Sequence, residues 1–264
     1  RSTLFPYTTL FRSPAGTIIW FIYFWLYLIA AWPVYLRARY LARRGRTEAH
    51  DALVRKVTGN WARRLIALAG GQVRVEGLEH LPDGPAVYVS NHLGYFDVPL
   101  VLGYLGDDTK PLMAKAGIAR LPLINQWMRE LHCVFIDRDN PRKAMAALSE
   151  AEHWVSEGYA MTVFPEGTRS VDGRVGEFKA GAFRIAQKNQ VPVVPFVIAG
   201  TDRMMHRGSL AVHPAAVTLT VLPPIDTAGF SRKDWKALPE QARARIVAAR
   251  NARIDEGCEK AKKS

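Results

Sequence analysis

At 264 residues and 48% hydrophobic composition, the chain is long enough for one sizeable core with an appendage, but short for two enzyme domains. Its 36 Lys and Arg against 24 Asp and Glu give a net charge of +12, which suits lipid headgroups, phosphorylated small molecules or nucleic acid. The two cysteines, Cys133 and Cys258, lie far apart and give no sign of a disulfide framework, which favours a reducing compartment.

The first part of the chain combines an atypical start with a long apolar stretch. Residues 1–13 have no helical or strand periodicity and resemble a translated sequencing adapter, so we treat them as a non-native extension. Residues 17–36 carry no charge and are about long enough to cross the hydrocarbon core of a bilayer, with Pro33 expected to kink the helix near its end. Five arginines follow between residues 37 and 46 and predict that the rest of the chain faces the cytoplasm. We expect membrane-anchoring helices over residues 14–70, and a buried core helix is the alternative.

Two further helices are predicted at either side of the central region. Residues 50–69 combine a helical apolar stripe with basic side chains, so this helix lies on the bilayer or packs on the catalytic domain, and the pattern does not decide between them. The Ala- and Arg-rich residues 238–263 predict a helix within a C-terminal tail of residues 226–264, which carries no recognisable chemistry.

Between these helices the pattern changes to short apolar runs that are typical of strands. These runs are residues 73–75, 86–89, 111–113, 134–136, 161–164, 193–198 and 217–221. Helical stretches such as residues 141–157 and 178–188 fall between several of them. The alternation predicts an α/β fold with a mixed, largely parallel sheet flanked by helices, and a catalytic domain over residues 71–225. Functional side chains are then expected at strand ends.

Two His/Asp pairs share the same spacing of five residues. His92 and Asp97 can meet if the histidine lies in a loop just before a helix that begins near the aspartate, and the turn formers after the strand at 86–89 permit this. His132 and Asp137 flank an apolar run that predicts a strand, where side chains five apart point to opposite faces. We therefore expect the first pair to be functional and the second to be a coincidence.

A second polar segment, residues 164–169, also follows an apolar strand. Gly167 lets the backbone approach a ligand closely, and the forked guanidinium of Arg169 suits a phosphate. Glu166 could hydrogen-bond a substrate hydroxyl or hold Arg169 in place. Arg138 follows another strand and could clamp a phosphate, although a solvated or ion-paired arginine is an equal alternative.

Four ordered segments together resemble the 1-acylglycerol-3-phosphate acyltransferase family of bacterial phospholipid synthesis. Residues 91–97 are similar to its first motif, 135–138 to its second, 164–169 to its third and 191–195 to its fourth. Residues 114–116, followed by 121–123, also resemble the family. The similarity runs from about residue 17 to residue 224.

The resemblance implies transfer of a fatty acyl group from acyl-CoA or acyl carrier protein to the sn-2 hydroxyl of 1-acylglycerol-3-phosphate, giving phosphatidic acid. His92 would be the general base and Asp97 would orient it, without an acyl-enzyme. Substrate contacts are expected from Glu166, Gly167, Thr168, Arg169, Arg138 and Lys115. No metal and no cofactor beyond the thioester co-substrate is expected. The implied setting is the inner (cytoplasmic) membrane with the catalytic domain facing the cytoplasm, and the partners are membrane lipids and a lysophospholipid rather than nucleic acid.

Alternative functions are weighed from one departure from the family motif and from motifs that the sequence lacks. The family commonly has serine two residues after the motif histidine, whereas this chain has Gly94, which leaves another acceptor such as lyso-ornithine lipid open. A serine hydrolase is disfavoured because no Gly-x-Ser-x-Gly elbow is present, although Ser90 could carry an acyl group. A non-enzymatic basic membrane protein that binds lipid or nucleic acid would explain the charge, but not the placement of His92 and Asp97.

Overall fold

The computed structural model describes residues 14–170 and 173–262, and the predicted non-native extension, residues 1–13, lies outside them. The strands are β1 (Gln72–Glu76), β2 (Val87–Ser90), β3 (Met113–Lys115), β4 (Val134–Ile136), β5 (Met161–Val163), β6 (Val193–Ala199) and β7 (Ala216–Val221). The α-helices are α2 (Pro14–Ala30), α3 (Trp32–Arg43), α4 (Thr47–Leu68), α5 (Asp97–Tyr104), α6 (Ile124–Glu130), α7 (Pro141–Ser156), α8 (Gly181–Asn189), α9 (Thr201–Met204) and α10 (Arg232–Lys262). Two 3-10 turns, η1 (Leu78–His80) and η2 (Ala116–Arg120), complete the described elements.

The sheet is mixed, with parallel pairing predominating. Five strands lie in the order β1-β7-β6-β2-β5, and only the β6–β7 pair is antiparallel. Strands β3 and β4 form a second parallel pair, and a parallel bridge from Leu112 to Thr162 connects that pair to β5. The predicted α/β fold with a helix-flanked sheet is confirmed. Parallel strands bring their carboxyl ends to one edge, where ligands of such sheets bind.

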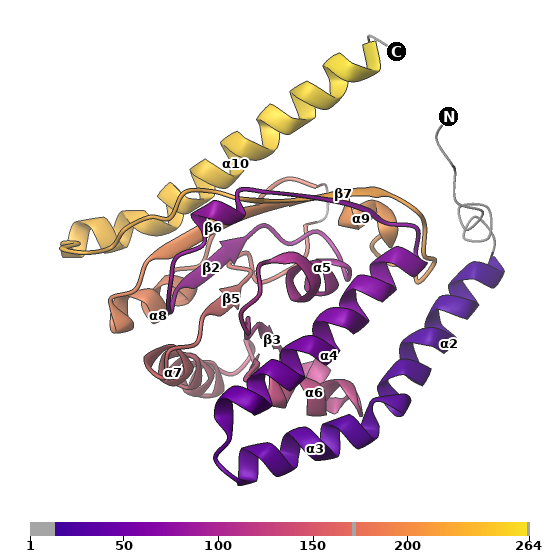
Figure 1. Cartoon of the computed structure of the whole chain (residues 1–264). Coiled ribbons are helices and arrows are strands. Elements are labelled where there is room, and N and C mark those ends of the chain that lie inside the picture. Colours follow the sequence, from indigo (N-terminus) through magenta and orange to yellow (C-terminus); the bar gives the residue numbers. More distant parts are fainter. Residues whose placement is uncertain (1–13, 171–172, 263–264) are drawn as a thin grey trace.

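Side chains alternate between the two faces of the sheet and build a separate core on each. Val87 and Val89 of β2 join one core with α7, α8 and α10, whereas Tyr88 joins the other with the N-terminal helices and α5. All three side chains are almost fully buried. Figure 1 shows α10 along one side of the sheet and α4 and α5 on the other. This two-sided burial explains why the central strands β2 and β6 read as nearly unbroken apolar runs.

The predicted apolar helix over residues 17–36 is two helices, because the chain breaks at Ala31. Helices α2 and α3 meet at an angle of 43°, directly before Pro33 in the first turn of α3. Within the described residues no single helix is long and apolar enough to cross a bilayer, whereas this bent pair passes on length and composition when taken together. The break fits the rule that a proline is accepted in the first turn of a helix but not in its interior.

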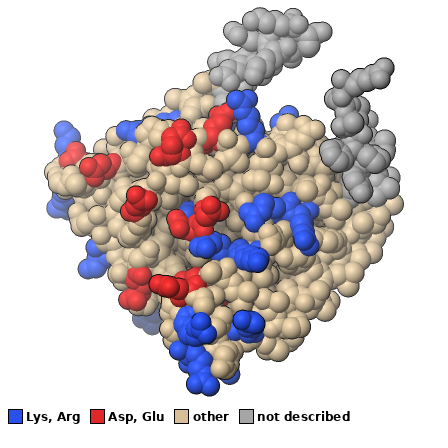
Figure 2. Space-filling view, in the orientation of Figure 1, with Lys and Arg blue, Asp and Glu red and all other residues tan. Residues whose placement is uncertain are grey.

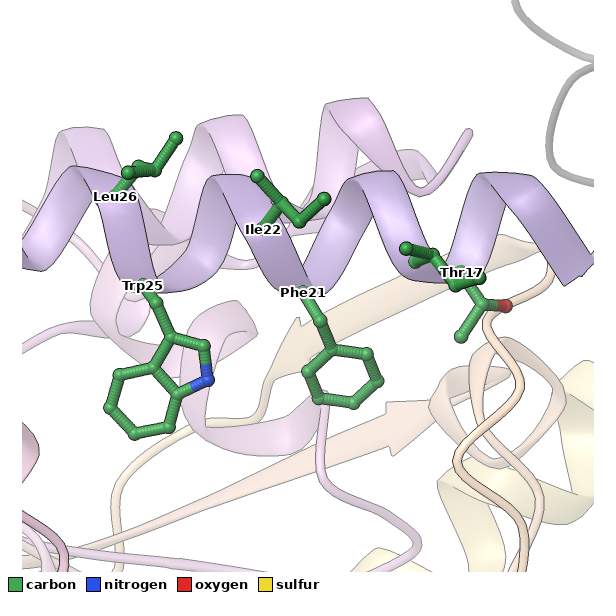
Figure 3. Close-up of a pocket in the computed structure, with 6 residues that line it drawn as sticks. Thr17, Phe21, Ile22, Trp25 and Leu26 are labelled. Carbon is green, nitrogen blue, oxygen red and sulfur yellow. The ribbon is translucent and has the colours of Figure 1, made fainter.

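Helix α2 is held on helix α4 by its aromatic side chains and remains apolar on its outer side. Trp20 donates its indole N–H to the Leu65 carbonyl at 2.9 Å, and Tyr27 donates to the Val57 carbonyl at 3.1 Å. Figure 3 shows the outer groove, where Phe21 and Trp25 point to one side and Ile22 and Leu26 to another. In Figure 2 this part of the surface carries few charges, whereas Lys and Arg gather near the end of α3.

Helix α4 packs on the catalytic domain, which decides the alternative that the sequence left open. Val54, Ala62 and Leu65 on this helix are fully buried. Gly59 lets α4 approach α5 closely, since a Cβ at that position would lie 3.3 Å from the Leu102 carbonyl oxygen. An interior glycine weakens an isolated helix, and here it permits the close contact.

Candidate active site

The His92–Asp97 pair forms as the sequence predicted. His92 lies in the loop that leaves β2 at its carboxyl end, and Asp97 is the first residue of α5. The Nδ1 atom of His92 lies 2.6 Å from Oδ2 of Asp97. A carboxylate at this distance accepts the Nδ1 hydrogen and leaves Nε2 as the basic nitrogen.

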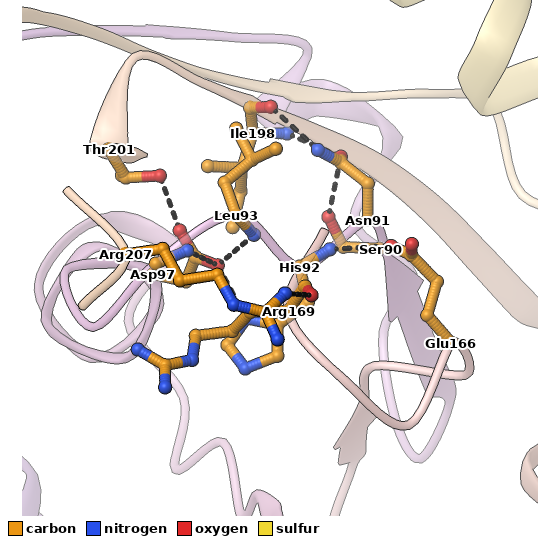
Figure 4. A network of polar contacts seen from close by, with 11 residues as sticks. Ser90, Asn91, His92, Leu93, Asp97, Glu166, Arg169, Ile198, Thr201 and Arg207 are labelled. Atoms are coloured by element: carbon orange, nitrogen blue, oxygen red, sulfur yellow. Dashed lines mark hydrogen bonds and ion pairs between the residues drawn. The ribbon is translucent and has the colours of Figure 1, made fainter. Parts of the chain in front are cut away.

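Asp97 is held by four hydrogen bonds and is completely buried. Besides the imidazole, Oδ2 accepts the backbone N–H groups of Leu93 at 2.7 Å and Gly94 at 2.9 Å. Thr201, at the start of α9, donates its hydroxyl to Oδ1 at 2.5 Å. Figure 4 shows these contacts converging on one carboxylate. A buried acid with all its partners in place can hold the imidazole in a fixed orientation.

The imidazole of His92 is oriented by stacking and keeps one face of the site open. Its ring lies on the ring of Phe164, with centroids 4.4 Å apart and planes inclined by 18°. The side chain is 22% exposed, and no described residue forms a hydrogen bond with Nε2. This nitrogen is therefore accessible to a reactant.

Asn91 fixes the loop before His92 to the neighbouring strand. Its side-chain amide donates to the carbonyl of Ile198 at 2.9 Å and accepts from the Ile198 N–H at 3.0 Å. Backbone pairing between β2 and β6 ends at Ser90 and Phe196, so the side chain of Asn91 continues the pairing beyond the last strand residues. The loop is thereby anchored at the sheet edge.

Glu166 connects the second predicted segment to the first. Its Oε1 accepts the backbone N–H of His92 at 2.8 Å, and its Oε2 accepts that of Gly176 at 2.8 Å. The backbone N–H of Ser170 also donates to the carbonyl of His92 at 2.8 Å. The two motifs are therefore directly bonded. The carboxylate holds the histidine loop and forms no hydrogen bond with Arg169 in the described residues, whereas its contact with a substrate hydroxyl stays a prediction.

Two cations converge on the turn at Gly167. This glycine has φ of 77°, a conformation that side chains other than glycine rarely adopt. A Cβ at its position would lie 3.2 Å from Nζ of Lys179 and 3.3 Å from Nη1 of Arg138. Neither cation forms an ion pair with any residue in the described ranges. The turn presents concentrated positive charge that suits an anionic group.

The remaining predicted residues lie around this turn with different degrees of exposure. The Arg169 guanidinium lies 3.9 Å above the ring of Tyr95, and Arg207 donates to the Arg169 carbonyl at 2.9 Å. Thr168 is exposed next to it. Lys115 is exposed at the end of β3, in register with Ile136 of β4, two residues before Arg138. Every predicted site residue is therefore on the carboxyl side of a strand.

The second His/Asp pair does not form. His132 precedes β4, and its nearest acidic partner is Asp51 of α4, at 3.7 Å from Nε2. Asp137 follows β4 and lies 3.7 Å from Nζ of Lys143. The strand between them separates their side chains, as the sequence argument required.

Three residues of the site are missing from the sequence prediction. Thr201 and Asn91 act through hydrogen bonds to distant segments, and no local pattern indicates such partners. Lys179 had a usable signal, because it stands two residues before α8, where a cation opposes the helix dipole. A lysine at that position suggests an anion nearby.

Comparison with known proteins gives a consistent family. The model of the Acyltransferase family matches residues 72–199. The chain is 44% identical over 137 residues to the chloroplastic 1-acyl-sn-glycerol-3-phosphate acyltransferase BAT2 of Brassica napus, covering 51% of this chain and 39% of that protein. It is 33% identical over 221 residues to the 1-acyl-sn-glycerol-3-phosphate acyltransferase of Cocos nucifera, covering 83% of this chain and 64% of that protein. The chain thus spans less than two thirds of the length of these relatives.

The match to a solved structure covers most of both chains. The crystal structure of the 1-acyl-sn-glycerophosphate (LPA) acyltransferase PlsC from Thermotoga maritima superposes with a TM-score of 0.72 at 30% identity. The match covers 88% of this chain and 96% of the Thermotoga chain. With the His92 and Glu166 segments joined at one sheet edge, the chain belongs to the 1-acyl-sn-glycerol-3-phosphate acyltransferase family.

Proposed function

We propose that the protein transfers a fatty acyl group from an acyl thioester, acyl-CoA or acyl carrier protein, to the sn-2 hydroxyl of 1-acylglycerol-3-phosphate. The product would be phosphatidic acid. The observation that carries the proposal is the His92–Asp97 hydrogen bond of 2.6 Å beside a turn with free cations. The names of the relatives support the same acceptor class.

The chemistry follows from the orientation of the imidazole. Nε2 of His92 removes the proton of the acceptor hydroxyl while the oxygen attacks the thioester carbonyl carbon. Asp97 stabilises the imidazolium that forms, and the protonation state of Asp97 does not change during the reaction. The tetrahedral intermediate then expels the thiolate, which takes the proton from His92. The ester forms, the thioester bond breaks, and the enzyme returns to its starting state without an acyl-enzyme.

Binding of the acceptor phosphate is assigned to the cations at the Gly167 turn. Arg138 and Lys179 converge there without an acidic partner in the described ranges, and Arg169 lies on the same turn. A phosphate between them would replace water by charge-assisted hydrogen bonds. Lys115 at the end of β3 is a further ligand in this proposal, and a backbone N–H near Gly167 is the candidate oxyanion donor.

Membrane association is assigned to the outer side of α2. Ile18, Ile22, Leu26 and Ile29 are each more than half exposed and recur at helical spacing. Such a stripe would lie at the boundary between the headgroups and the acyl chains of a bilayer. The arginines between residues 37 and 46 would then lie near the headgroups. Replacing Ile22 and Leu26 together by Glu should abolish co-flotation with anionic vesicles, whereas replacing exposed Leu210 by Glu should not. Equal flotation of both variants would remove α2 from the interface.

The direct test is an acyl-transfer assay with a panel of acceptors. Washed membranes containing the protein are supplied with a radiolabelled acyl thioester and with 1-acylglycerol-3-phosphate, lyso-ornithine lipid or other lysolipids. We expect label in phosphatidic acid and release of one thiol per ester formed. A burst of thiol without product would indicate an acyl-enzyme, and label only in another lipid would change the acceptor.

Two histidine variants separate chemistry from folding in the same assay. Replacing His92 by Ala should lower turnover by about two to four orders of magnitude, because the general base is lost. Replacing His132 by Ala should leave turnover nearly unchanged when the protein is assayed folded. Retained turnover in the His92 variant would disprove the base assignment.

A further inference from the structure

A second cluster of ionisable side chains lies away from the active site. His50 and Asp51 are in the first turns of α4, and the His50 side chain is only 4% exposed. Nδ1 of His50 lies 2.8 Å from Oδ1 of Asp51, and its Nε2 lies 3.0 Å from Oε2 of Glu130 at the end of α6. His132 and Tyr159 complete the group, and Tyr159 donates its hydroxyl to Oδ2 of Asp51 at 2.7 Å.

The cluster is at the opposite edge of the sheet from the active site. His132 stands before β4 and Tyr159 before β5, whereas Arg138 and Glu166 follow those same strands. Nothing in the proposed acyl transfer uses these side chains. The cluster brings together α4, the end of α6 and the α7–β5 connection, which are distant in the sequence.

One ring nitrogen in this cluster has no hydrogen-bond partner among the described residues. Nε2 of His132 is buried and makes no hydrogen bond, since its distance of 3.7 Å from Oδ1 of Asp51 is too long. The rings of Trp154 and Tyr159 pack against the His132 imidazole, with ring centroids 4.0 Å and 4.5 Å away. A ring nitrogen without a hydrogen-bond partner is available to bind a metal ion.

The donor atoms have the spacing of a metal site. Nδ1 of His50, a carboxylate oxygen of Asp51 and a ring nitrogen of His132 all lie within 4.8 Å of one another. Ligand atoms at the usual bond lengths around a tetrahedral ion are about 3.3 Å apart. The separations of 2.8 Å and 3.7 Å to Oδ1 of Asp51 are each within about half an ångström of that value.

The surrounding side chains would hold these ligands in the required state. Glu130 accepts the Nε2 hydrogen of His50, which leaves Nδ1 as the coordinating atom. Tyr159 bonds Oδ2 of Asp51 and leaves Oδ1 for the ion. The carboxylates of Asp51 and Glu130 also supply negative charge. Arg39 lies 3.7 Å from Glu130 but is half exposed, so solvent screens its positive charge.

We propose that His50, Asp51 and His132 form a structural site for a divalent ion of the zinc type, which ties α4 to the sheet. Two imidazoles and one carboxylate suit Zn²⁺ or Co²⁺ rather than Mg²⁺ or Ca²⁺, which prefer oxygen ligands alone. Sequence spacing could not indicate the site, because its ligands come from distant segments.

The test is a Co²⁺ titration of full-length protein freed of metal with a chelator. We expect saturable 1:1 binding with visible absorption bands of a four-coordinate ion, and displacement of Co²⁺ by Zn²⁺. Replacing His132 by Gln should weaken binding at least about tenfold. Zn²⁺ should raise the melting temperature of the original protein and have a smaller effect on that of His132→Gln, provided the variant folds by circular dichroism.

Matched controls distinguish this site from other histidines. His153 is exposed on α7 beside Trp154 and outside the cluster, and His206 lies near His213, with ring centroids 5.7 Å apart. His153→Gln and His206→Gln should bind Co²⁺ like the original protein. Absence of 1:1 binding at tens of micromolar ion, or unchanged binding in His132→Gln, would overturn the proposal. Because acyl transfer does not enter the measurement, either result leaves the proposed function intact.

Discussion

The hydroxyl of Thr201 lies 2.5 Å from Oδ1 of Asp97, the carboxylate oxygen that His92 does not use. Both residues are fully buried, so the bond has no water to replace it. The orientation of the His92 imidazole therefore depends on the start of α9 as well as on its own loop.

Replacing Thr201 by Val tests this dependence. The lost hydrogen bond leaves Oδ1 without a donor, and we expect about a tenfold lower kcat with little change in KM. Thr201→Ser keeps the hydroxyl and should retain most of the activity. Steady-state kinetics on both variants provides the measurement, and an unchanged kcat in Thr201→Val would mean that the remaining bonds suffice.

Replacing Asp97 by Asn keeps the shape of the side chain and removes its charge. The amide oxygen can still accept the Nδ1 hydrogen, but it stabilises the imidazolium poorly, so we expect kcat to fall by about two orders of magnitude or more. The matched control is Asp202→Asn, because Asp202 is a partly buried neighbour in α9 that does not contact His92. Equal activity of the two variants would contradict an electrostatic role for Asp97.

Glu166 is predicted to contribute to stability as well as to activity. Its two oxygens accept the backbone N–H groups of His92 and Gly176, and Gln can replace only one of them. We expect Glu166→Gln to lower the free energy of unfolding by about 1–3 kcal/mol, measured by urea titration. A variant with full stability but reduced acceptor binding would instead assign Glu166 to the substrate.

Lys179 is predicted to bind the phosphate of the acceptor. Replacing it by Met removes one of the cations at the Gly167 turn, so KM for 1-acylglycerol-3-phosphate should rise more than kcat falls. Lys188→Met, at the exposed far end of α8, is the control and should behave like the original enzyme. Similar kinetics for both variants would remove Lys179 from the site.

The thiol of Cys133 should be unreactive in the folded protein. Burial raises its pKa to about 12, and its side chain is almost inaccessible. At pH 8 this leaves roughly a thousandfold less thiolate than an ordinary cysteine has. In a Cys258→Ser background, alkylation by iodoacetamide should be very slow until urea unfolds the chain. Rapid labelling of the native protein would show that the region opens.

Much of the fold could be predicted because the central strands are buried on both faces and form nearly continuous apolar runs, whereas β1 and β7 alternate apolar and polar side chains. Six of the seven predicted runs coincide with strands to within a residue at either end, whereas β3 begins at Met113 rather than at residue 111. Pro111 lacks a backbone N–H, and Leu112 donates its N–H to Sγ of Cys133, so the parallel pairing with β4 starts later. That side-chain bond has no signature in the sequence.

The site could be predicted where its residues lie close together in the chain or directly follow an apolar strand. His92 and Asp97 are near neighbours, and a loop followed by a helix can bring them together. Thr201 and Lys179 reach the site through tertiary contacts, which local patterns do not encode. The predicted kink at Pro33 lies after the observed break at Ala31. A proline near the end of an apolar run suggests a kink, whereas here it stands in the first turn of a new helix.

Asn91 determines where the histidine loop leaves the sheet. Its carboxamide imitates a peptide group toward Ile198, so β2 and β6 remain joined although their backbones have already separated. Reactants therefore meet His92 just beyond the point where β2 leaves its backbone pairing with β6, and the Asn91 side chain holds that point in place.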